Sequence, residues 1–217
     1  MNGHRFTLSG ATLSALPSGA LWWGDRALLA VGDLHLGRSS RIARLGGTLL
    51  PPYEVAETLG RLDADIARTG ARTVLCLGDS FDDLASADLG EDHRLWLTRL
   101  MAGRRWIWIE GNHDPGPVAL PGEHLRDLAL GPLTFRHIAQ PGARGEVSGH
   151  YHPKMRVAGP ARPCFLIDAS RVILPAYGAY TGGMDATRPP LSDLMGPGAI
   201  ACLTGPTPCA LPLKGPR

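Results

Sequence analysis

The sequence predicts an α/β fold in which two β-sheets pack against each other. In the first half of the chain, short apolar runs alternate with segments of helical periodicity, as in strands joined by helices. In the second half, short strands are separated by turns rich in proline and glycine, with little helical pattern. An α/β half joined to a β-rich half implies two packed sheets, and 217 residues suit a single domain over 1–217.

The first half begins with strand signals. Residues 6–23 alternate weakly between apolar and polar types and contain several turn residues, which predicts a hairpin. Residues 27–31 form an apolar run that ends at Gly32, the pattern of a buried strand. We expect the next segment, 38–47, to be a loop because it is rich in arginine and glycine.

Two helices are expected next. Pro51 and Pro52 open the first, because proline is favoured in a first helical turn, and Gly70 ends it. Its apolar stripe consists of Val55, Leu59, Leu62 and Ile66. The second helix is expected at about 91–101, between strands at 73–77 and 106–109.

The second half is expected to be mostly strands. They are predicted at 133–137, 146–148, 164–168, 172–174 and 199–203. The proline-rich tail, 205–217, is expected to be an irregular wrap or partly frayed.

The composition limits the function classes without choosing among them. Hydrophobic residues make up 44% and charged residues 19% of the chain, the proportions of a soluble globular protein. The formal net charge of +2 is too small to argue for nucleic acid binding. Of the 22 basic residues, all but Lys154 and Lys214 are arginine, which suits phosphate binding, although a GC-rich genome explains the bias more simply.

The cysteines and the apolar runs favour a cytoplasmic protein. None of the four cysteines forms a C-x-x-C pair, and Cys76 lies in an apolar run, so free thiols are expected. No run approaches the ~18 apolar residues of a membrane span, and the N-terminal segment has no leader pattern. We therefore expect a cytoplasmic protein with no membrane partner.

Four short motifs carry the chemistry of the chain, and each follows an apolar run. They are Asp33-Leu34-His35, Gly78-Asp79, Gly111-Asn112-His113-Asp114 and Gly149-His150-Tyr151-His152. Because buried strands end at the edge of a sheet, the motifs should gather carboxylate, amide and imidazole groups in one cleft. Such mixed ligands suit Mn²⁺, Fe or Zn²⁺ better than Mg²⁺. The alternative is that these residues are helix caps, turn residues and surface histidines.

The four motifs in this order resemble those of the calcineurin-like metallophosphoesterase superfamily over nearly the whole chain. The resemblance implies a four-layer αββα sandwich, with two mixed β-sheets flanked by helices. More narrowly, the chain resembles the DNA-ligase-associated metallophosphoesterases, also called ligase-associated DNA damage response endonucleases. The narrower resemblance is carried by residues 33–39, 50–53, 77–81, 149–153, 162–165 and 174–183.

The resemblance implies a set of ligands for two metal ions. Those of the first ion are Asp33, His35, Asp79 and His152. Asp79 also bridges to the second ion, whose other ligands are Asn112, His150 and one histidine between the third and fourth motifs. We choose His137 over His124, because 133–136 reads as a strand that delivers His137. His124 follows a turn and more readily starts a helix.

The resemblance also assigns the reacting groups. His113 is expected to donate a proton to the leaving oxygen or to stabilise the transition state. Asp114 is expected to hold the His113 imidazole in position. Asp82 departs from the family, because related chains often carry histidine there. Its carboxylate adds negative charge near the metals, although Asp82 fits the broader G-D-x-x-D pattern of the superfamily.

Two pairs of residues are candidates for substrate binding. Arg38 and Arg41 follow the first motif, where they could grip phosphates beside the scissile bond; the alternative is a solvated loop. The narrower resemblance implies that Tyr177 and Tyr180 line the cleft and stack on an unpaired base. The alternative for both tyrosines is packing in the second sheet.

The sequence therefore predicts a phosphodiesterase with two divalent transition-metal ions, Mn²⁺ first, with Fe or Zn²⁺ as alternatives. The narrower resemblance implies a DNA endonuclease that prefers single strands and acts in repair, in association with an ATP-dependent DNA ligase and a helicase. A small-molecule phosphohydrolase is the second hypothesis. A metal-bound scaffold without turnover is the third, and it is disfavoured because a scaffold does not need His113 as a proton donor.

Overall fold

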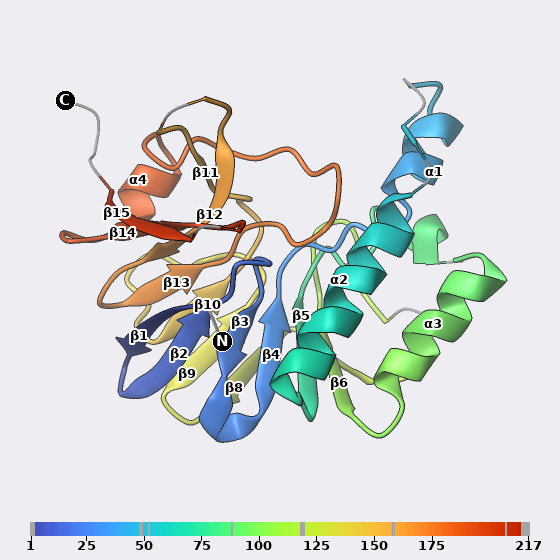
Figure 1. Ribbon diagram of the computed structural model, residues 1–217, viewed down its shortest axis with the longest axis horizontal. Helices are drawn as coiled ribbons and strands as arrows, with labels where there is room; N and C mark the ends of the chain where they lie inside the picture. The colour runs from blue at the N-terminus through green and yellow to red at the C-terminus, as the bar shows by residue number, and fades with distance from the viewer. Residues whose placement is uncertain are drawn as a thin grey trace.

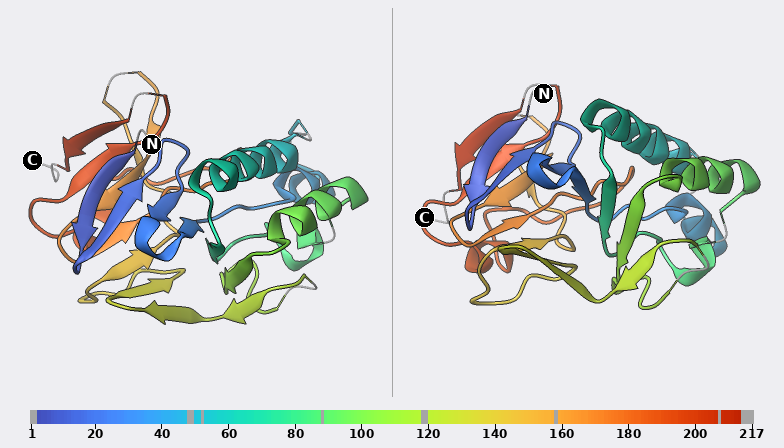
Figure 2. Two further views of the ribbon diagram at one scale, coloured as in Figure 1. Left: turned by 60° about the horizontal axis from the view of Figure 1, so that its bottom comes forward. Right: turned by 90° about the horizontal axis from the view of Figure 1, so that it is seen from below.

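The computed structural model describes residues 3–47, 50–51, 53–87, 89–117, 120–157, 159–206 and 208–213. Two mixed β-sheets pack face to face, and the helices α2 (Glu54–Thr69) and α3 (Glu91–Met101) lie against the outer face of the first sheet (Figure 1). The turned views show both helices on one side of the sheets (Figure 2). The predicted pair of packed sheets is confirmed.

The first sheet has seven strands in the order in which they occur in the chain. They are β1 (His4–Leu8), β2 (Ala11–Ala15), β3 (Leu21–Trp23), β4 (Leu28–Val31), β5 (Thr73–Leu77), β6 (Arg105–Ile109) and β7 (Glu123–Leu125). From β1 to β4 neighbouring strands are antiparallel, so the predicted hairpin extends into a meander. From β4 to β7 they are parallel, and their carboxyl ends meet at one edge of the sheet.

The second sheet has the strand order β15, β14, β12, β13, β10, β9, β8, and β11 pairs with β12. The bounds are β8 (Asp127–Leu130), β9 (Leu133–Arg136), β10 (Glu146–Ser148), β11 (Lys154–Met155), β12 (Arg162–Ile167), β13 (Arg171–Ile173), β14 (Ile200–Leu203) and β15 (Cys209–Pro212). β9, β10 and β13 are parallel neighbours, and the other pairs are antiparallel.

The central strands of the first sheet are buried on both faces. In β4, Leu29 and Val31 face the helices, whereas Leu28 and Ala30 face the second sheet. β5 and β6 alternate in the same way. A strand covered on both sides needs apolar residues at every position, which is why these strands read as continuous apolar runs in the sequence.

α2 confirms the helix predicted from its apolar stripe. Val55, Leu59, Leu62 and Ile66 are all buried against the first sheet. Burial of such a side chain contributes about 1.5–3 kcal/mol. The helix ends at Gly70, whose φ of 66° lies in the left-handed region and whose N–H donates to the carbonyl of Ile66. Pro52, expected to open the helix, lies outside the described residues.

The outer face of the second sheet is covered by a thinner layer. Leu191 of the short helix α4 (Leu191–Leu194) packs there with Cys164, Leu166 and Ile173. Two 3₁₀ turns, η1 (Gly24–Arg26) and η2 (Leu84–Ala87), also occur in the described part of the chain. None of the described helices has the length and apolar character needed to cross a membrane.

The segment expected to be an arginine-rich loop contains a helix, α1 (Arg38–Arg44). Tertiary contacts stabilise it, because the N–H and the hydroxyl of Ser39 both donate to the Glu54 carboxylate of α2, at 3.1 and 2.7 Å. The arginines of α1 also pair with acidic residues that follow β5. The loop prediction was therefore wrong for these residues.

Two further predictions were wrong. His124 does not start a helix; it lies in β7, in register with Trp108 of the parallel strand β6. Residues 209–212 of the tail form β15, an edge strand that continues the second sheet beyond β14. Pairing with an existing strand gives these residues backbone partners that local sequence does not reveal.

Candidate metal centre

The predicted metal ligands lie just beyond the carboxyl ends of parallel strands. In the first sheet, Asp33, Asp79 and Asn112 follow β4, β5 and β6. In the second sheet, His137 follows β9 and His150 follows β10. Asp33 and His150 are 117 positions apart, yet the Asp33 carboxylate accepts the backbone N–H of His150 at 2.9 Å. Residues from both sheets therefore meet at one site.

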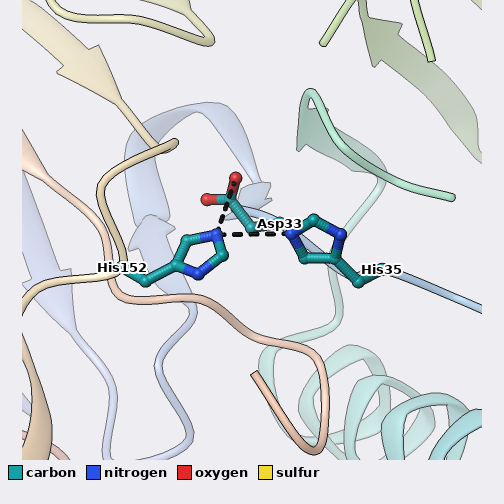
Figure 3. Close-up of side chains that lie close together, drawn as sticks. All are labelled: Asp33, His35 and His152. Carbon is teal, nitrogen blue, oxygen red and sulfur yellow. Dashed lines mark hydrogen bonds and ion pairs between the residues drawn. The ribbon is translucent and has the colours of Figure 1, made fainter. Parts of the chain in front are cut away.

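Asp33, His35 and His152 form a first cluster. The Nε2 atoms of the two histidines are 3.3 Å apart, and Asp33 Oδ1 lies 3.3 Å from His152 Nε2. Figure 3 shows the three side chains pointing toward one another. Their ligand atoms lie within 4.8 Å of each other, close enough to hold one cation.

Asp79, His137, His150 and Asn112 form a second cluster. His137 Nε2 lies 3.3 Å from Asp79 Oδ2, 3.1 Å from His150 Nδ1 and 2.9 Å from Asn112 Oδ1. Because these four polar atoms converge on one point, the second cluster also has the geometry of a cation site. Asp79 and His137 are buried, whereas Asn112 is exposed, so this cluster is open to solvent on one side.

Asp79 connects the two clusters. Its Oδ2 lies 3.3 Å from His137 Nε2 in the second cluster and 4.0 Å from His35 Nε2 in the first. Burial opposes ionisation, but the contact with His137 outweighs it and lowers the pKa of Asp79 to about 2. An ionised carboxylate between two cation sites can serve as a bridging ligand.

Several of the predicted ligands have a strained backbone conformation. In the described part of the chain, five of the eight non-glycine residues with positive φ belong to the two clusters: Asp33, His35, Asp79, His150 and His152. A side chain in the left-handed region costs about 1–3 kcal/mol, and such residues gather at functional sites. The fold tolerates this cost because the strained conformations aim the ligand atoms at the two cation positions.

Glycine at two motif positions allows the elements to approach closely. Gly78 has a φ of 80°, and a Cβ at this position would overlap the His137 imidazole. A Cβ at Gly149 would lie 2.5 Å from Asp33 Oδ2. Each glycine therefore makes room for a ligand of the opposite sheet.

The donor set fits divalent metal ions. The Nδ1 of His137 donates to the Leu77 carbonyl at 2.8 Å, and His35 Nδ1 lies 2.9 Å from Asp82 Oδ1. A metal ion that displaces the proton from Nε2 of His137 would leave the other proton on Nδ1, facing the Leu77 carbonyl, and Nε2 of His35 faces the first cluster in the same way. Burial and then the neighbouring His137 lower the pKa of His150, which favours the neutral form that a metal ion requires.

Asp82 is a residue whose role the sequence did not reveal. Its side chain is fully buried, with Oδ1 2.9 Å from both His35 Nδ1 and an Arg38 guanidinium nitrogen. Oδ2 lies 3.2 Å from Arg41. Burial opposes ionisation, but His35 and Arg38 outweigh it and lower the pKa of Asp82 to about 2. The G-D-x-x-D spacing was the available signal, but spacing alone does not show that Asp82 orients His35.

His113 lies beside the first cluster without belonging to either cluster. Its ring centroid is 5.0 Å from that of His35, and its Nδ1 donates to the Asp82 carbonyl at 2.8 Å. The backbone N–H of His113 donates to Asp79 Oδ1 at 2.9 Å. The free edge of the ring, Nε2, is therefore the atom that can exchange a proton.

Asp114 does not hold the His113 imidazole as expected; the Asp82 carbonyl takes that position. The two carboxylate oxygens of Asp114 accept backbone N–H groups at 2.8 to 3.2 Å, donated by Asp79, Ser80, Phe81 and Gly111. Asp114 therefore fixes the loop that carries Asp79. Burial raises the pKa of Asp114 above its usual range.

The candidate substrate residues have different environments. Arg38 and Arg41 are 26% and 34% exposed at their side chains and both contact Asp82, so neither lies in a solvated loop. Tyr177 cannot line the cleft, because it is fully buried and its hydroxyl donates to Asp65 at 2.9 Å. Tyr180 is 41% exposed. It remains available to a ligand.

Residues 27–165 match the sequence profile of the family described as calcineurin-like phosphoesterase, which covers more than half of the chain. The fold and the two ligand clusters agree with this match. The chain belongs to the calcineurin-like phosphoesterase family and is a metal-dependent phosphoester hydrolase.

The structure is similar to the crystal structure of Pseudomonas putida nuclease MPE, with a TM-score of 0.77 and 26% sequence identity. The similarity covers 97% of this chain and 100% of that chain. No curated protein is significantly similar to this chain.

Proposed function

We propose that this chain is a two-metal phosphodiesterase that cleaves DNA, prefers single strands and acts in DNA repair. The observation that carries the proposal is the position of Asp79 Oδ2 between the ring nitrogens of His35 and His137. One carboxylate oxygen shared by two ligand clusters is what a two-metal centre requires. The DNA substrate is supported by the similarity to nuclease MPE and by the narrower sequence resemblance.

The two clusters would hold two divalent ions, with Asp79 as the shared ligand. When bound, such a pair neutralises the charge of a phosphodiester and supplies a hydroxide as nucleophile. Mixed nitrogen and oxygen ligands favour Mn²⁺, Fe or Zn²⁺, and we propose Mn²⁺. The role of the protein is to keep the ligand atoms in place, which the outer contacts of His35 and His137 do.

His113 is the proton donor in this proposal. The Asp82 carbonyl fixes the proton of Nδ1, so Nε2 is the atom that protonates the leaving oxygen. The bond from the backbone N–H of His113 to Asp79 Oδ1 holds the main chain of His113 beside both clusters. Because the His113 ring belongs to neither cluster, its removal should slow the reaction without removing the metals.

Tyr180 is our candidate for contact with an unpaired base. The loop that carries it is anchored at both ends to ligands of the first cluster. Gly178 N–H donates to the Asp33 carbonyl at 3.1 Å, and Met184 N–H donates to the His152 carbonyl at 3.2 Å. An exposed aromatic ring held this close to a phosphodiester site can stack on a base of single-stranded DNA.

Arg38 and Arg41 are our candidates for binding flanking phosphates on the side of the first cluster. Both guanidinium groups are partly exposed and can contact a phosphate while they stay near Asp82. We extend the proposal to an association with an ATP-dependent DNA ligase and a helicase, as the narrower resemblance implies. A cytoplasmic location belongs to the same proposal and is supported by four free cysteines.

The proposal is tested by incubating the metal-stripped protein with Mn²⁺ and circular single-stranded DNA. We expect the native protein to linearise the circle, which requires endonucleolytic cleavage, and His113→Ala to leave it intact. Bis(p-nitrophenyl) phosphate is the parallel substrate, because it reports phosphodiester hydrolysis without DNA binding. A duplex circle of the same length measures the strand preference.

Each hypothesis predicts a different result. Hydrolysis of the aryl diester with intact DNA would contradict the DNA assignment and favour a small-molecule phosphohydrolase. No turnover on either substrate, with metals bound, would favour the non-catalytic scaffold. Equal cleavage of the single-stranded and the duplex circle would contradict the proposed preference for single strands.

A further inference from the structure

A cleft of about 420 Å³ opens directly beside the second cluster. Its wall on the side of the metal centre is formed by Asn112 and His137, and the remaining wall includes Glu110, Arg126, Ile138 and Gln140. This volume lies within the range of about 300–1,000 Å³ that is usual for small-ligand sites. A molecule in the cleft would therefore touch two residues of the second cluster.

The backbone fixes the shape of this cleft. Arg126 stands between β7 and β8, at the point where the chain passes from the first sheet to the second. The N–H of Glu110 donates to the Leu125 carbonyl at 2.9 Å, which holds the segment after β6 beside this crossing. The cleft is thus bounded by segments that follow strands of both sheets.

Arg126 is the cation of the cleft that is available to a ligand. It is exposed, and it makes no ion pair with any residue in the described ranges. Arg136, also in the wall, is only 14% exposed at its side chain and lies 3.6 Å from Asp127 and 3.5 Å from Glu146. Arg136 is therefore paired with these two carboxylates, whereas Arg126 can bind an anionic group of a ligand.

The other groups in the wall indicate the class of ligand. Glu110 is exposed there, and its carboxylate would repel a bare phosphate but can accept from the amino and imino groups of a nucleobase. Gln140 offers both a donor and an acceptor. Ile138, 44% exposed, provides an apolar surface for the face of a base. Asp127 also lines the cleft and lies 3.6 Å from Arg136, so these two charges face each other. One available cation, polar partners and an apolar wall together suit a nucleotide better than a phosphate ion.

We infer that this cleft is a subsite for one unpaired nucleotide, next to the scissile phosphodiester on the side of Asn112 and His137. The inference rests on the proposed function and deepens it. A base in the cleft must leave its stack and its partner, which favours single-stranded over duplex substrates. Arg38 and Arg41 contact Asp82 beside the first cluster, whereas the cleft adjoins the second, so a strand that spans both clusters can meet arginine near each.

The test uses two variants of exposed residues, Arg126→Glu and Ile138→Trp, in the full chain loaded with Mn²⁺. The first reverses the charge of the cleft, and the second fills it without a change of charge. Arg5→Glu is the matched control, since Arg5 is exposed on β1 and lies outside the cleft. The steady-state KM and kcat are measured with a single-stranded oligonucleotide and with bis(p-nitrophenyl) phosphate.

We expect both cleft variants to raise the KM for the oligonucleotide by about tenfold, the effect of losing one good contact. The KM for the aryl diester should change much less, because this substrate has neither the base nor the flanking phosphate that the cleft would bind. Arg5→Glu should resemble the native protein with both substrates.

Two results would overturn the inference, and they are distinguishable. If the native protein cleaves the oligonucleotide and both cleft variants match Arg5→Glu, the cleft binds no nucleotide, although the proposed function stands. If the native protein hydrolyses only the aryl diester, the proposed function fails and the subsite fails with it. An effect of Arg126→Glu without one of Ile138→Trp would show long-range charge rather than occupancy of the cleft, and would also contradict the inference.

Discussion

The two ligand clusters are supported in different ways. In the first, His35 Nδ1 faces the Asp82 carboxylate, which contacts the partly exposed Arg38 and Arg41. In the second, His137 Nδ1 donates to the carbonyl of Leu77, the last residue of β5. One imidazole is oriented by charged side chains that reach the surface, and the other is oriented by the main chain of a central strand.

This difference between the two clusters indicates which of them is more sensitive to a single substitution. The Leu77 carbonyl is present whatever side chain stands at that position, so the second cluster persists as long as the sheet folds. The first cluster depends on three charged side chains, each of which a single substitution removes. We therefore expect the first cluster to be the more easily perturbed, both by mutation and by the charge of a bound substrate.

The largest loss of activity is expected for Asp79→Asn. This variant should affect both clusters alike, because Asp79 contacts both. With a pKa of about 2, Asp79 is ionised at neutral pH, so the variant removes a full charge between the two cation positions. We expect turnover of the aryl diester to fall by about 10⁴-fold, with both metals bound more weakly. Asp25→Asn, at an exposed position in η1, is the matched control. Retention of two tightly bound metals by Asp79→Asn would contradict the bridging role.

His113→Ala should separate catalysis from metal binding. The His113 ring lies outside the two clusters defined above and groups instead with His35 and Asp82. Because its Nδ1 already contacts the Asp82 carbonyl, we expect kcat to fall by about 10²- to 10³-fold while the metal content is unchanged. Elemental analysis of the dialysed protein beside steady-state kinetics measures both quantities. A parallel loss of metal and activity would show that His113 is structural rather than a proton donor.

Asp82→Ala tests most directly whether the two clusters are supported in different ways. We expect affinity for one of two Mn²⁺ ions to fall by about 10- to 100-fold, because His35 loses the carboxylate that orients it, whereas the other ion binds as before. Calorimetric titration of the metal-free protein resolves the two events. Asp82→Asn, which keeps an oxygen acceptor for His35, should recover part of the lost affinity. Equal weakening of both ions would mean that the clusters do not differ in the way described.

The smallest effect is expected far from the metals, at Asp168→Asn. The Asp168 carboxylate accepts N–H groups of Ser170, Arg171 and Gly196 at 2.7 to 2.8 Å. Burial opposes ionisation, but these bonds outweigh it and lower the pKa of Asp168. We expect a loss of about 1–3 kcal/mol in the free energy of unfolding at pH 7, with activity and metal content unchanged.

The pH dependence of this loss has a definite sign. Because the folded-state pKa of Asp168 is depressed, its stabilisation is fully present above the unfolded value of about 3.9 and is lost as pH falls through the folded value. Urea denaturation between neutral and acidic pH should therefore show the native protein and Asp168→Asn converging in acid. A difference that is constant with pH would contradict this assignment.

Much of the fold could be predicted because its elements are periodic or continuously apolar. β5 and α3 have the expected bounds, since a strand covered on both faces and an amphipathic helix each leave a local pattern. α1 was missed because its contacts, Ser39 with Glu54 and its arginines with Asp82, are tertiary. β15 was missed because an edge strand gains its partners from β14 rather than from its own residues.

For the site, too, local sequence revealed some features, whereas others depend on tertiary contacts. The candidate ligands could be chosen because their motifs stand at strand ends, which local sequence marks. The contacts that orient these ligands could not, since the Leu77 carbonyl and the Asp82 side chain meet the histidines only after both sheets have packed. Tyr177 illustrates the error, because nothing in its local sequence shows that its hydroxyl is buried against Asp65.

The central claim is that two metal ions share Asp79, and anomalous diffraction at the manganese edge tests it most directly. Crystals grown with Mn²⁺ should show two anomalous peaks about 3.5–4 Å apart. One peak should lie among Asp33, His35 and His152, the other among Asn112, His137 and His150, with the Asp79 carboxylate contacting both. A single peak at saturating Mn²⁺, or two peaks without Asp79 between them, would contradict the account.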